Sequence, residues 1–278
     1  MRKLKNSIGI GIDIGQKDIM TLSVVSIKDM IRKKQFRNVY TERYRNFNKF
    51  EYLPSEYRGK KTFAKIKEMN AEISKLKKYS DLNSIDMIHD IQADKKSLLK
   101  KIYKKNISDL LDFYEPDFVC MESITNKSWK KNKSISTMHN IDDINVDILK
   151  KVVKSQCEKR NIDFIIADDQ FASTLNCHKC GCKNKRQDHY ERELYCEYCY
   201  EWYDRDYNAS VNLAIYGAYI YTYLWTEREA NSWTPAGDTV EEQSECMNDI
   251  TQMYEEIAKS IRRKLLKRYS YLSDIVIH

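Results

Sequence analysis

Two C-x-x-C pairs constrain the fold of this 278-residue chain more than any other feature of its sequence. Residues 181–195 separate Cys177 and Cys180 from Cys196 and Cys199. This spacing is typical of a zinc ribbon, in which thiolates hold one Zn²⁺ ion tetrahedrally. Because a complete set of sulfur ligands leaves no coordination position for a substrate, we predict a structural zinc. The alternative is a pair of unrelated thiol motifs in a reducing compartment.

The zinc-ribbon prediction needs no ligand outside these pairs. His178, Cys182 and His189 lie nearby in the sequence, but the sulfur set is complete without them. We predict that the remaining cysteines are ordinary buried thiols, namely Cys120, Cys157 and Cys246.

No secretory signal and no membrane span is recognisable in the sequence. The N-terminal segment "IGIGIDIG" is interrupted by glycines and Asp13, so it cannot serve as the apolar core of a signal peptide. The longest apolar run, 213–225, is too short to cross a bilayer and is rich in tyrosine, which predicts a buried helix. We therefore predict a cytoplasmic protein without a membrane partner, in which cysteines favour metal over disulfides.

Strand and helix patterns alternate along the chain and predict a mixed α/β sheet flanked by helices. The predicted strands cover residues 8–15, 19–27, 33–40, 117–123 and 162–168. The predicted helices cover residues 60–78, 83–113, 146–159 and 207–225. The first three strands follow one another directly and are expected to form a meander.

Changes in composition and periodicity along the sequence divide the chain into four parts. Residues 1–169 are the first part of the α/β domain, 170–200 an inserted cysteine module, and 201–225 a helix that closes the domain. Residues 226–278 contain a polar linker over 226–245 and a C-terminal amphipathic helix. The apolar stripe predicted for that helix consists of Met247, Ile250, Met253, Ile257, Ile261 and Leu265.

Three carboxylates stand in or beside predicted strands and helices. Asp13 shares a face of the first strand with Gly9 and Gly11, where small neighbours are expected to leave room for a ligand. Glu122 ends an apolar strand, and Asp206 opens the helix after the cysteine module. A single acid at such a position is usually a turn or cap residue. Three acids from separate elements can hold two Mg²⁺ ions about 4 Å apart, which activate water for phosphodiester hydrolysis.

A basic segment directly follows Glu122 in the sequence. The formal net charge of +7 fits a nucleic-acid partner, although a general bias toward Lys, Asn and Ile explains much of this excess. Lysines neutralise phosphates and tryptophan stacks on bases. We therefore predict a nucleic-acid contact through Lys127, Trp129, Lys130, Lys131 and Lys133, with a solvated loop as the alternative.

The motifs "GIDIG", "VCMES", "CHKCG…CEYC" and "DRDYNASVNLA" occur in an order that resembles TnpB proteins and the related small type V CRISPR effectors. The resemblance covers roughly residues 8–225. It implies a RuvC-like nuclease domain of RNase H-like fold, with a zinc ribbon inserted before the last motif. It also implies that Asp13, Glu122 and Asp206 are catalytic ligands of two Mg²⁺ ions, for which Mn²⁺ can substitute. By the same motif match, Asp204 is an accessory or cap residue.

This resemblance further implies a two-metal-ion DNA endonuclease of transposon origin that is guided by RNA. Its partners would be a DNA substrate and a guide RNA, and DNA binding would place it at the nucleoid. TnpB proteins carry a recognition region before the first catalytic aspartate, whereas Asp13 stands near the start of this chain. We therefore expect a missing recognition region or a separate recognition subunit.

Other classes of protein share parts of this pattern. Sugar kinases and actin-like ATPases have a similar first strand but lack the cysteine module followed by an aspartate. The alternatives within the pattern are a regulator that binds guide RNA or DNA without cutting, a stand-alone structure-selective nuclease such as a junction resolvase, and a non-enzymatic zinc-ribbon module.

Overall fold

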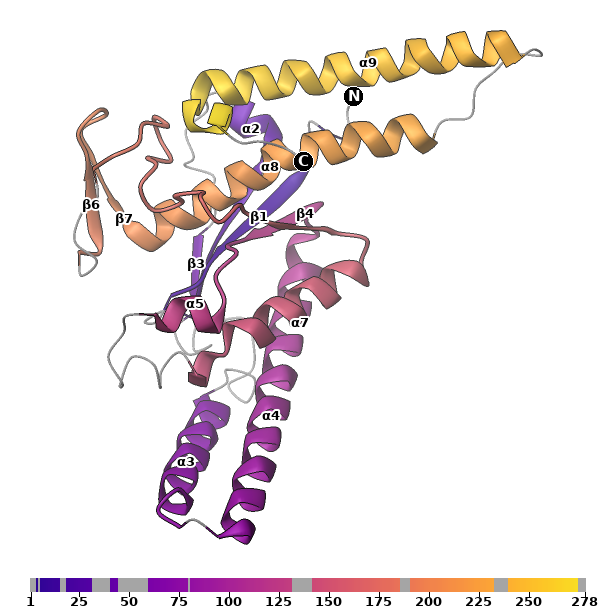
Figure 1. The fold of residues 1–278 in the computed structure, drawn as a ribbon. Helices are drawn as coiled ribbons and strands as arrows, with labels where there is room; N and C mark the ends of the chain where they lie inside the picture. Colours follow the sequence, from indigo (N-terminus) through magenta and orange to yellow (C-terminus); the bar gives the residue numbers. More distant parts are fainter. Residues whose placement is uncertain are drawn as a thin grey trace.

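The structure is a computed structural model that describes residues 4, 6–15, 19–31, 41–44, 60–79, 81–131, 142–185, 191–232 and 240–274. Its centre is a five-stranded sheet with the order β3-β2-β1-β4-β5. Helices cover both faces of this sheet, and the cysteine module lies to one side as a two-stranded hairpin (Figure 1). The mixed α/β architecture predicted from the sequence is confirmed.

The sheet joins an antiparallel meander to two parallel strands. Strands β1 (Ile8–Asp13), β2 (Met20–Ser26) and β3 (Thr41–Tyr44) pair antiparallel in chain order. Strands β4 (Phe118–Met121) and β5 (Asp163–Ile166) run parallel to β1. The meander is confirmed, while the strand predicted over 33–40 lies outside the described residues.

One face of the sheet packs against helices from the middle of the chain. Helices α4 (Leu82–Tyr114) and α7 (Val146–Glu158) cover this face and form a core with Ile10 and Ile12 of β1. Asp81 caps the start of α4 by accepting a hydrogen bond from the Ser84 amide, at 2.8 Å. The helix ends at Tyr114, one residue after the predicted end, and Glu115 is its C-cap just before Pro116.

Helices from the C-terminal part of the chain cover the opposite face of the sheet. Helix α8 (Arg205–Ser232) lies against β1, β2 and β4, and α9 (Val240–Arg268) packs on α8. Their shared core includes Phe118, Ala214, Ile261 and Leu265. Because side chains alternate along β1, its isoleucines face one pair of helices and its glycines face the other.

The glycines of β1 make room for protein and not for a ligand, so that expectation is wrong. A Cβ atom at Gly11 would lie 2.1 Å from the carbonyl oxygen of Ser210 and 2.3 Å from the amide nitrogen of Ala214. A Cβ atom at Gly9 would lie 1.8 Å from the ring of Phe118. The absence of a side chain at Gly11 therefore lets the backbone of α8 approach the sheet.

We expect Gly11→Ala to lower the free energy of unfolding by about 3 kcal/mol, at the upper end for overpacking, because the clash is with backbone. Urea denaturation followed by circular dichroism measures this change. Gly217→Ala is the matched comparison, since the atoms nearest to its Cβ would be side-chain atoms of Cys120 and Phe118, at 2.7 Å and 2.9 Å, and not backbone atoms of a neighbouring element. Equal losses in the two variants would contradict the close seating of α8.

Two helical pairs extend beyond the sheet (Figure 1). Helix α3 (Lys60–Leu76) pairs with the start of α4, and the far ends of α8 and α9 pair with each other. The linker predicted over 226–245 is wrong at both ends, because α8 continues to Ser232 and α9 begins at Val240. No helix within the described parts of the chain is long and apolar enough to span a bilayer.

The C-terminal helix buries only part of its predicted stripe. Ile261 and Leu265 are buried, whereas Met253 is 47% exposed in the half that extends beyond the sheet. The side chains of Met247 and Ile250 lie outside the described residues. The last turn of the chain, η3 (Ser270–Asp274), folds back on α9.

Candidate active site

The ends of β1 and β4 bring two of the predicted acids together. The strands are parallel, with Ile12 opposite Met121, so Asp13 and Glu122 follow at the same edge of the sheet. Asp13 is 6% exposed, and its carboxyl group forms a hydrogen bond with that of Glu122. The parallel pairing of the two strands therefore brings these two acids side by side.

The third acid reaches the same place from the helix on the glycine face of β1. Asp206 lies in the first turn of α8, and Asp204 caps that helix by accepting a hydrogen bond from the Tyr207 amide at 2.9 Å. The predicted cap role of Asp204 is confirmed. Since α8 approaches β1 closely at Gly11, its first turn lies near Asp13, which is on the same face of that strand.

The pKa of Asp13 reflects the proximity of the other two acids. Its pKa is raised well above its usual range, first by burial, then by the hydrogen bond and charge of Glu122, and then by the charge of Asp206. The nearby Arg205 opposes this rise only in part. The fold therefore brings three carboxyl groups from three separate elements close enough for their charges to act on Asp13, although they do not form a group with all oxygens within 4.8 Å of one another.

We expect Asp13→Asn to raise the free energy of unfolding of the Mg²⁺-free protein by about 0.5–2 kcal/mol, because it removes a buried carboxyl group from beside Glu122 and Asp206. Thermal unfolding without added Mg²⁺ should show a melting temperature higher by about 2–4 °C per kcal/mol. Adding Mg²⁺ should stabilise only the wild type, which reverses the difference. An unchanged melting temperature in both conditions would contradict the proximity of the three acids.

Basic groups that the sequence did not single out lie beside the acids. Arg192, at the entry to β6, pairs with Asp206 at 3.4 Å. Lys150 of α7 donates a hydrogen bond to the carbonyl of Ile124 at 3.0 Å, and burial lowers its pKa while Glu122 and other acids oppose the shift. These cations can offset the negative charge of the site when its carboxylates ionise.

A cavity of about 490 Å³ opens beside Glu122. Asp168 and Asp169, which lie just after β5 beyond Ala167, line it together with residues of the segment after β4. The sequence analysis missed both acids, although the carboxyl ends of adjacent parallel strands meet at one edge of a sheet and could have indicated them. The lining residues are Glu122, Ser123, Ile124, Thr125, Ser128, Ala167, Asp168, Asp169, Phe171 and Leu213.

Part of the basic segment after Glu122 is helical. Residues Asn126–Lys130 form the short helix α5, and Trp129 is partly buried against the core. Lys130 pairs with Asp142. Lys127 and Lys131 are exposed and can reach a phosphate, whereas Lys133 lies outside the described residues.

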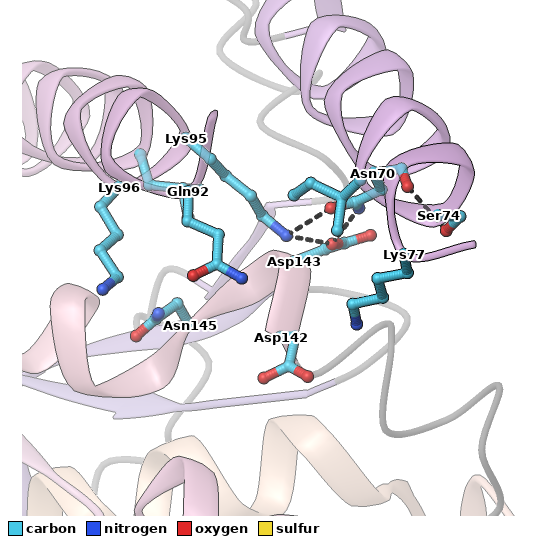
Figure 2. A pocket seen from close by; sticks show the side chains of 11 residues that line it. Asn70, Ser74, Lys77, Gln92, Lys95, Lys96, Asp142, Asp143 and Asn145 are labelled. Atoms are coloured by element: carbon cyan, nitrogen blue, oxygen red, sulfur yellow. Dashed lines mark hydrogen bonds and ion pairs between the residues drawn. The ribbon is translucent and has the colours of Figure 1, made fainter. Parts of the chain in front are cut away.

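A second cavity, of about 280 Å³, lies between α3, α4 and the approach to α7 (Figure 2). Lys95 is half-buried in the wall of this cavity. Its Nζ lies 2.8 Å from Asp143 Oδ1 and 2.8 Å from Asn70 Oδ1. Since Asp143 already neutralises this lysine, the contact fastens the α3–α4 pair to the start of α7.

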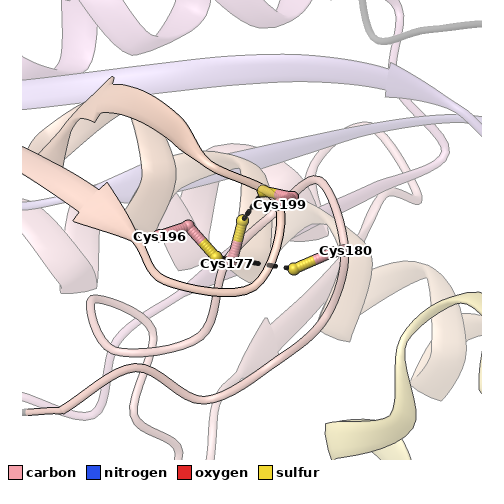
Figure 3. A group of neighbouring side chains, drawn as sticks. All are labelled: Cys177, Cys180, Cys196 and Cys199. Atoms are coloured by element: carbon pink, nitrogen blue, oxygen red, sulfur yellow. Dashed lines mark hydrogen bonds between the residues drawn. The ribbon is translucent and has the colours of Figure 1, made fainter.

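The four predicted cysteine ligands converge on one point (Figure 3). Their sulfur atoms all lie within 4.8 Å of one another, with 3.7 Å between Cys177 and Cys199 and 3.6 Å between Cys180 and Cys196. Tetrahedral ligands at the usual Zn–S distance are about 3.8 Å apart, so the spacing fits a zinc ion. Among the residues that the structure describes, no other group of acids, histidines or cysteines meets this criterion.

The hydrophobic core of the cysteine module is small. Strands β6 (Glu193–Cys196) and β7 (Glu201–Asp204) form its hairpin, and its core consists of Leu194 and Tyr203 beside the cysteines. Cys182 lies outside the four-sulfur group, as expected. Cys120 and Cys157 are buried thiols in the sheet domain, which confirms that prediction, while the side chain of Cys246 is not described.

The fold and the cysteine cluster define a mixed α/β domain that carries a small module suited to a metal ion. Residues 147–213 match the family model described as "Cas12f1-like, TNB domain". The chain also matches a structure titled "Cryo-EM structure of the Cas12f1-sgRNA-target DNA complex", with 17% identity and a TM-score of 0.52. That match covers 75% of this chain and 50% of the other, so this chain spans about half the length of that protein.

The comparison with curated proteins found no match. The family model covers the strand β5, the cysteine module and the start of α8, which contain the motif "CHKCG…CEYC" and most of "DRDYNASVNLA". The predicted similarity to TnpB proteins and small type V effectors is therefore confirmed.

Proposed function

We propose that this chain is a metal-dependent DNA endonuclease with a RuvC-like domain of RNase H-like fold. The observation that carries the proposal is that Asp13 and Glu122 lie at the ends of two adjacent parallel strands at one edge of the sheet, with Asp206 close enough for its charge to act on Asp13. The sheet order, with a meander followed by two parallel strands and helices on both faces, supports the RNase H-like assignment. Each acid arises from a different element, as a site for two ions requires.

In this proposal Asp13, Glu122 and Asp206 hold two Mg²⁺ ions, for which Mn²⁺ can substitute. When bound, such ions activate a water molecule and stabilise the leaving oxygen of a phosphodiester. Because burial and neighbouring acids raise the pKa of Asp13, and a metal ligand must be deprotonated, the affinity of the site for metal would rise with pH. The guanidinium of Arg192 would then release part of its ion pair with Asp206 and bind the substrate phosphate.

The exposed lysines beside the site complete the proposed substrate contact. Lys127 and Lys131 are exposed in the segment that follows Glu122, where they can neutralise phosphates of a DNA strand. Such contacts hold the backbone and read no base sequence. We propose that Trp129 supports this surface by packing against the core and does not stack on the substrate.

The likeness to a Cas12f1 protein solved with guide RNA and target DNA supports the same two partners for this chain. We propose that a guide RNA selects the DNA, with a recognition region or separate subunit that corresponds to part of the unmatched half of that structure. We further propose that Cys177, Cys180, Cys196 and Cys199 bind one structural Zn²⁺.

Cleavage of a labelled single-stranded DNA by the purified, zinc-loaded protein tests the proposal. We expect cutting with Mg²⁺, none without Mg²⁺ or with EDTA, and none with Asp13→Ala. Adding RNA that co-purifies with the protein should increase cutting if a guide is used. A folded, zinc-loaded protein that binds DNA and RNA but cuts with neither would overturn the nuclease proposal in favour of a binding regulator.

A further inference from the structure

Two buried asparagines of α8 hold the segment that leads into the cysteine module. Asn208 and Asn212 lie one helical turn apart, and both are 0% exposed. The side-chain amide of Asn208 donates to the carbonyl of Asn176 at 2.8 Å, and that of Asn212 donates to the same carbonyl at 2.6 Å. Asn212 also donates to the carbonyl of Ser173 at 2.7 Å. Both residues therefore bind the backbone just before the first cysteine.

Asn208 binds the chain on both sides of Cys177. Its side-chain oxygen accepts a hydrogen bond from the backbone amide of His178 at 2.9 Å, while its nitrogen donates to the carbonyl of Asn176. The ring nitrogen Nδ1 of His178 lies 3.0 Å from the same oxygen. A single side chain thus fixes the backbone on each side of a cysteine of the four-sulfur group.

The first turn of α8 is also joined to the cysteine module through its other strand. The backbone amide of Arg205 donates to the carbonyl of Arg192 at 2.7 Å, and the Arg192 guanidinium pairs with Asp206 at 3.4 Å. Strand β7 ends at Asp204 and α8 begins at the next residue, so no linker separates the module from the helix. Asp206 lies between these two attachments.

Breaking the attachments would leave polar groups of α8 buried without partners. The oxygen of Asn212 accepts from the Tyr271 hydroxyl at 3.1 Å, but both hydrogen bonds donated by its side-chain amide go to the segment before Cys177. A buried amide that loses its partners destabilises the structure around it. Unfolding of the cysteine module should therefore spread into the first turns of α8.

We propose that Asn208 and Asn212 are positioning residues that couple metal binding by the four cysteines to the placement of Asp206. The functional meaning of this coupling rests on the proposed role of Asp206 in the nuclease site, but the coupling itself does not. Because coupling between two sites is reciprocal, a cation held by the three acids should also strengthen retention of zinc.

Hydrogen–deuterium exchange of the full chain, zinc-loaded and zinc-depleted, tests the coupling. In the wild type, we expect zinc removal to speed amide exchange over residues 205–212 by about 10-fold or more, since local opening sets the rate. In Asn208→Ala with zinc still bound, the same amides should already exchange fast and respond less than about 2-fold to zinc removal. Zinc content, measured by mass spectrometry, confirms the loading of each sample.

Asn184→Ala is the matched control, because Asn184 donates to the Tyr203 hydroxyl at 2.7 Å within the cysteine module and not to α8. It should keep the zinc dependence of exchange in α8. If Asn208→Ala does not fold, Asn212→Ala tests the coupling instead. We expect amide exchange in α8 of this variant to lose its dependence on zinc in the same way. Wild-type protein whose α8 amides keep full protection without zinc would overturn the coupling.

Binding of Mn²⁺, followed by its paramagnetic resonance signal, separates this inference from the proposed function. We expect zinc removal to weaken Mn²⁺ binding about 10-fold in the wild type and hardly at all in Asn208→Ala. Zinc-loaded protein that binds no Mn²⁺ would overturn the proposed metal-dependent nuclease, while the exchange data would still decide the coupling. Mn²⁺ binding that is unaffected by zinc removal would overturn the inference alone.

Discussion

Asp206→Asn is expected to lower Mg²⁺-dependent DNA cleavage by at least about 10³-fold, whereas Asp204→Asn should leave it within about 2-fold of the wild type. The two aspartates are separated by one residue but have different roles. Asp206 is close enough to Asp13 to raise the pKa of that carboxyl group, so its loss removes a negatively charged ligand from the proposed metal site. Asp204 accepts a hydrogen bond from the Tyr207 amide. Asparagine caps a helix as well as aspartate does, so this substitution preserves the start of α8.

Single-turnover cleavage of a labelled DNA, with circular dichroism to confirm folding, measures this difference. The comparison is strict, because both variants lose one carboxylate at the same helix end and change the net charge equally. Loss of cleavage in both variants would mean that the charge of this helix end matters more than a particular ligand. Loss only in Asp204→Asn would reassign the third metal ligand to that residue.

Cys180→Ser is expected to abolish stoichiometric zinc binding and unfold the cysteine module, whereas Cys182→Ser should retain one zinc ion per chain. The Cys180 sulfur lies within 4.8 Å of each of its three partners, while Cys182 is outside that group. The binding free energy of a structural zinc, about 10–16 kcal/mol in small domains, is also the folding free energy of the module that holds it. A two-stranded hairpin with a core of Leu194, Tyr203 and cysteines cannot replace that contribution.

Elemental analysis of the purified variants gives the zinc content, and limited proteolysis reports the state of residues 177–203. We expect rapid cutting within this range in Cys180→Ser and resistance in Cys182→Ser. Retention of one tightly bound zinc by Cys180→Ser would contradict the four-sulfur site. Loss of zinc from both variants would indicate that Cys182 also contributes to the metal site.

Much of the fold was predictable because local patterns and global structure agree in this chain. The alternation in β1, the long helix that ends before Pro116 and the apolar helix after the cysteines all lie where their periodicities indicated. The errors occurred where local signals are weak. The polar stretch 226–245 has the composition of a linker, but most of it belongs to two helices that pack on each other beyond the sheet.

The candidate site was predictable in its members but not in its surroundings. The three acids belong to motifs, and motifs are visible in a sequence. Trp129 was expected to stack on bases, and only the structure shows that its side chain is partly buried against the core. Asp168, Lys150 and Arg192 belong to no motif and became visible only when strands and helices placed them beside Glu122 and Asp206.

By itself, the sequence determined the mixed α/β class and the four metal-suited cysteines, because periodicity and ligand spacing are local properties of the chain. Only the tertiary structure decided what the glycines of β1 do and how the cysteine module is connected to the acids. Gly11 admits the backbone of α8, and Asn208 and Asn212 bind that helix to the segment before Cys177. Such contacts join residues distant in sequence, and their partners are fixed only when burial removes water as the alternative partner for each polar group.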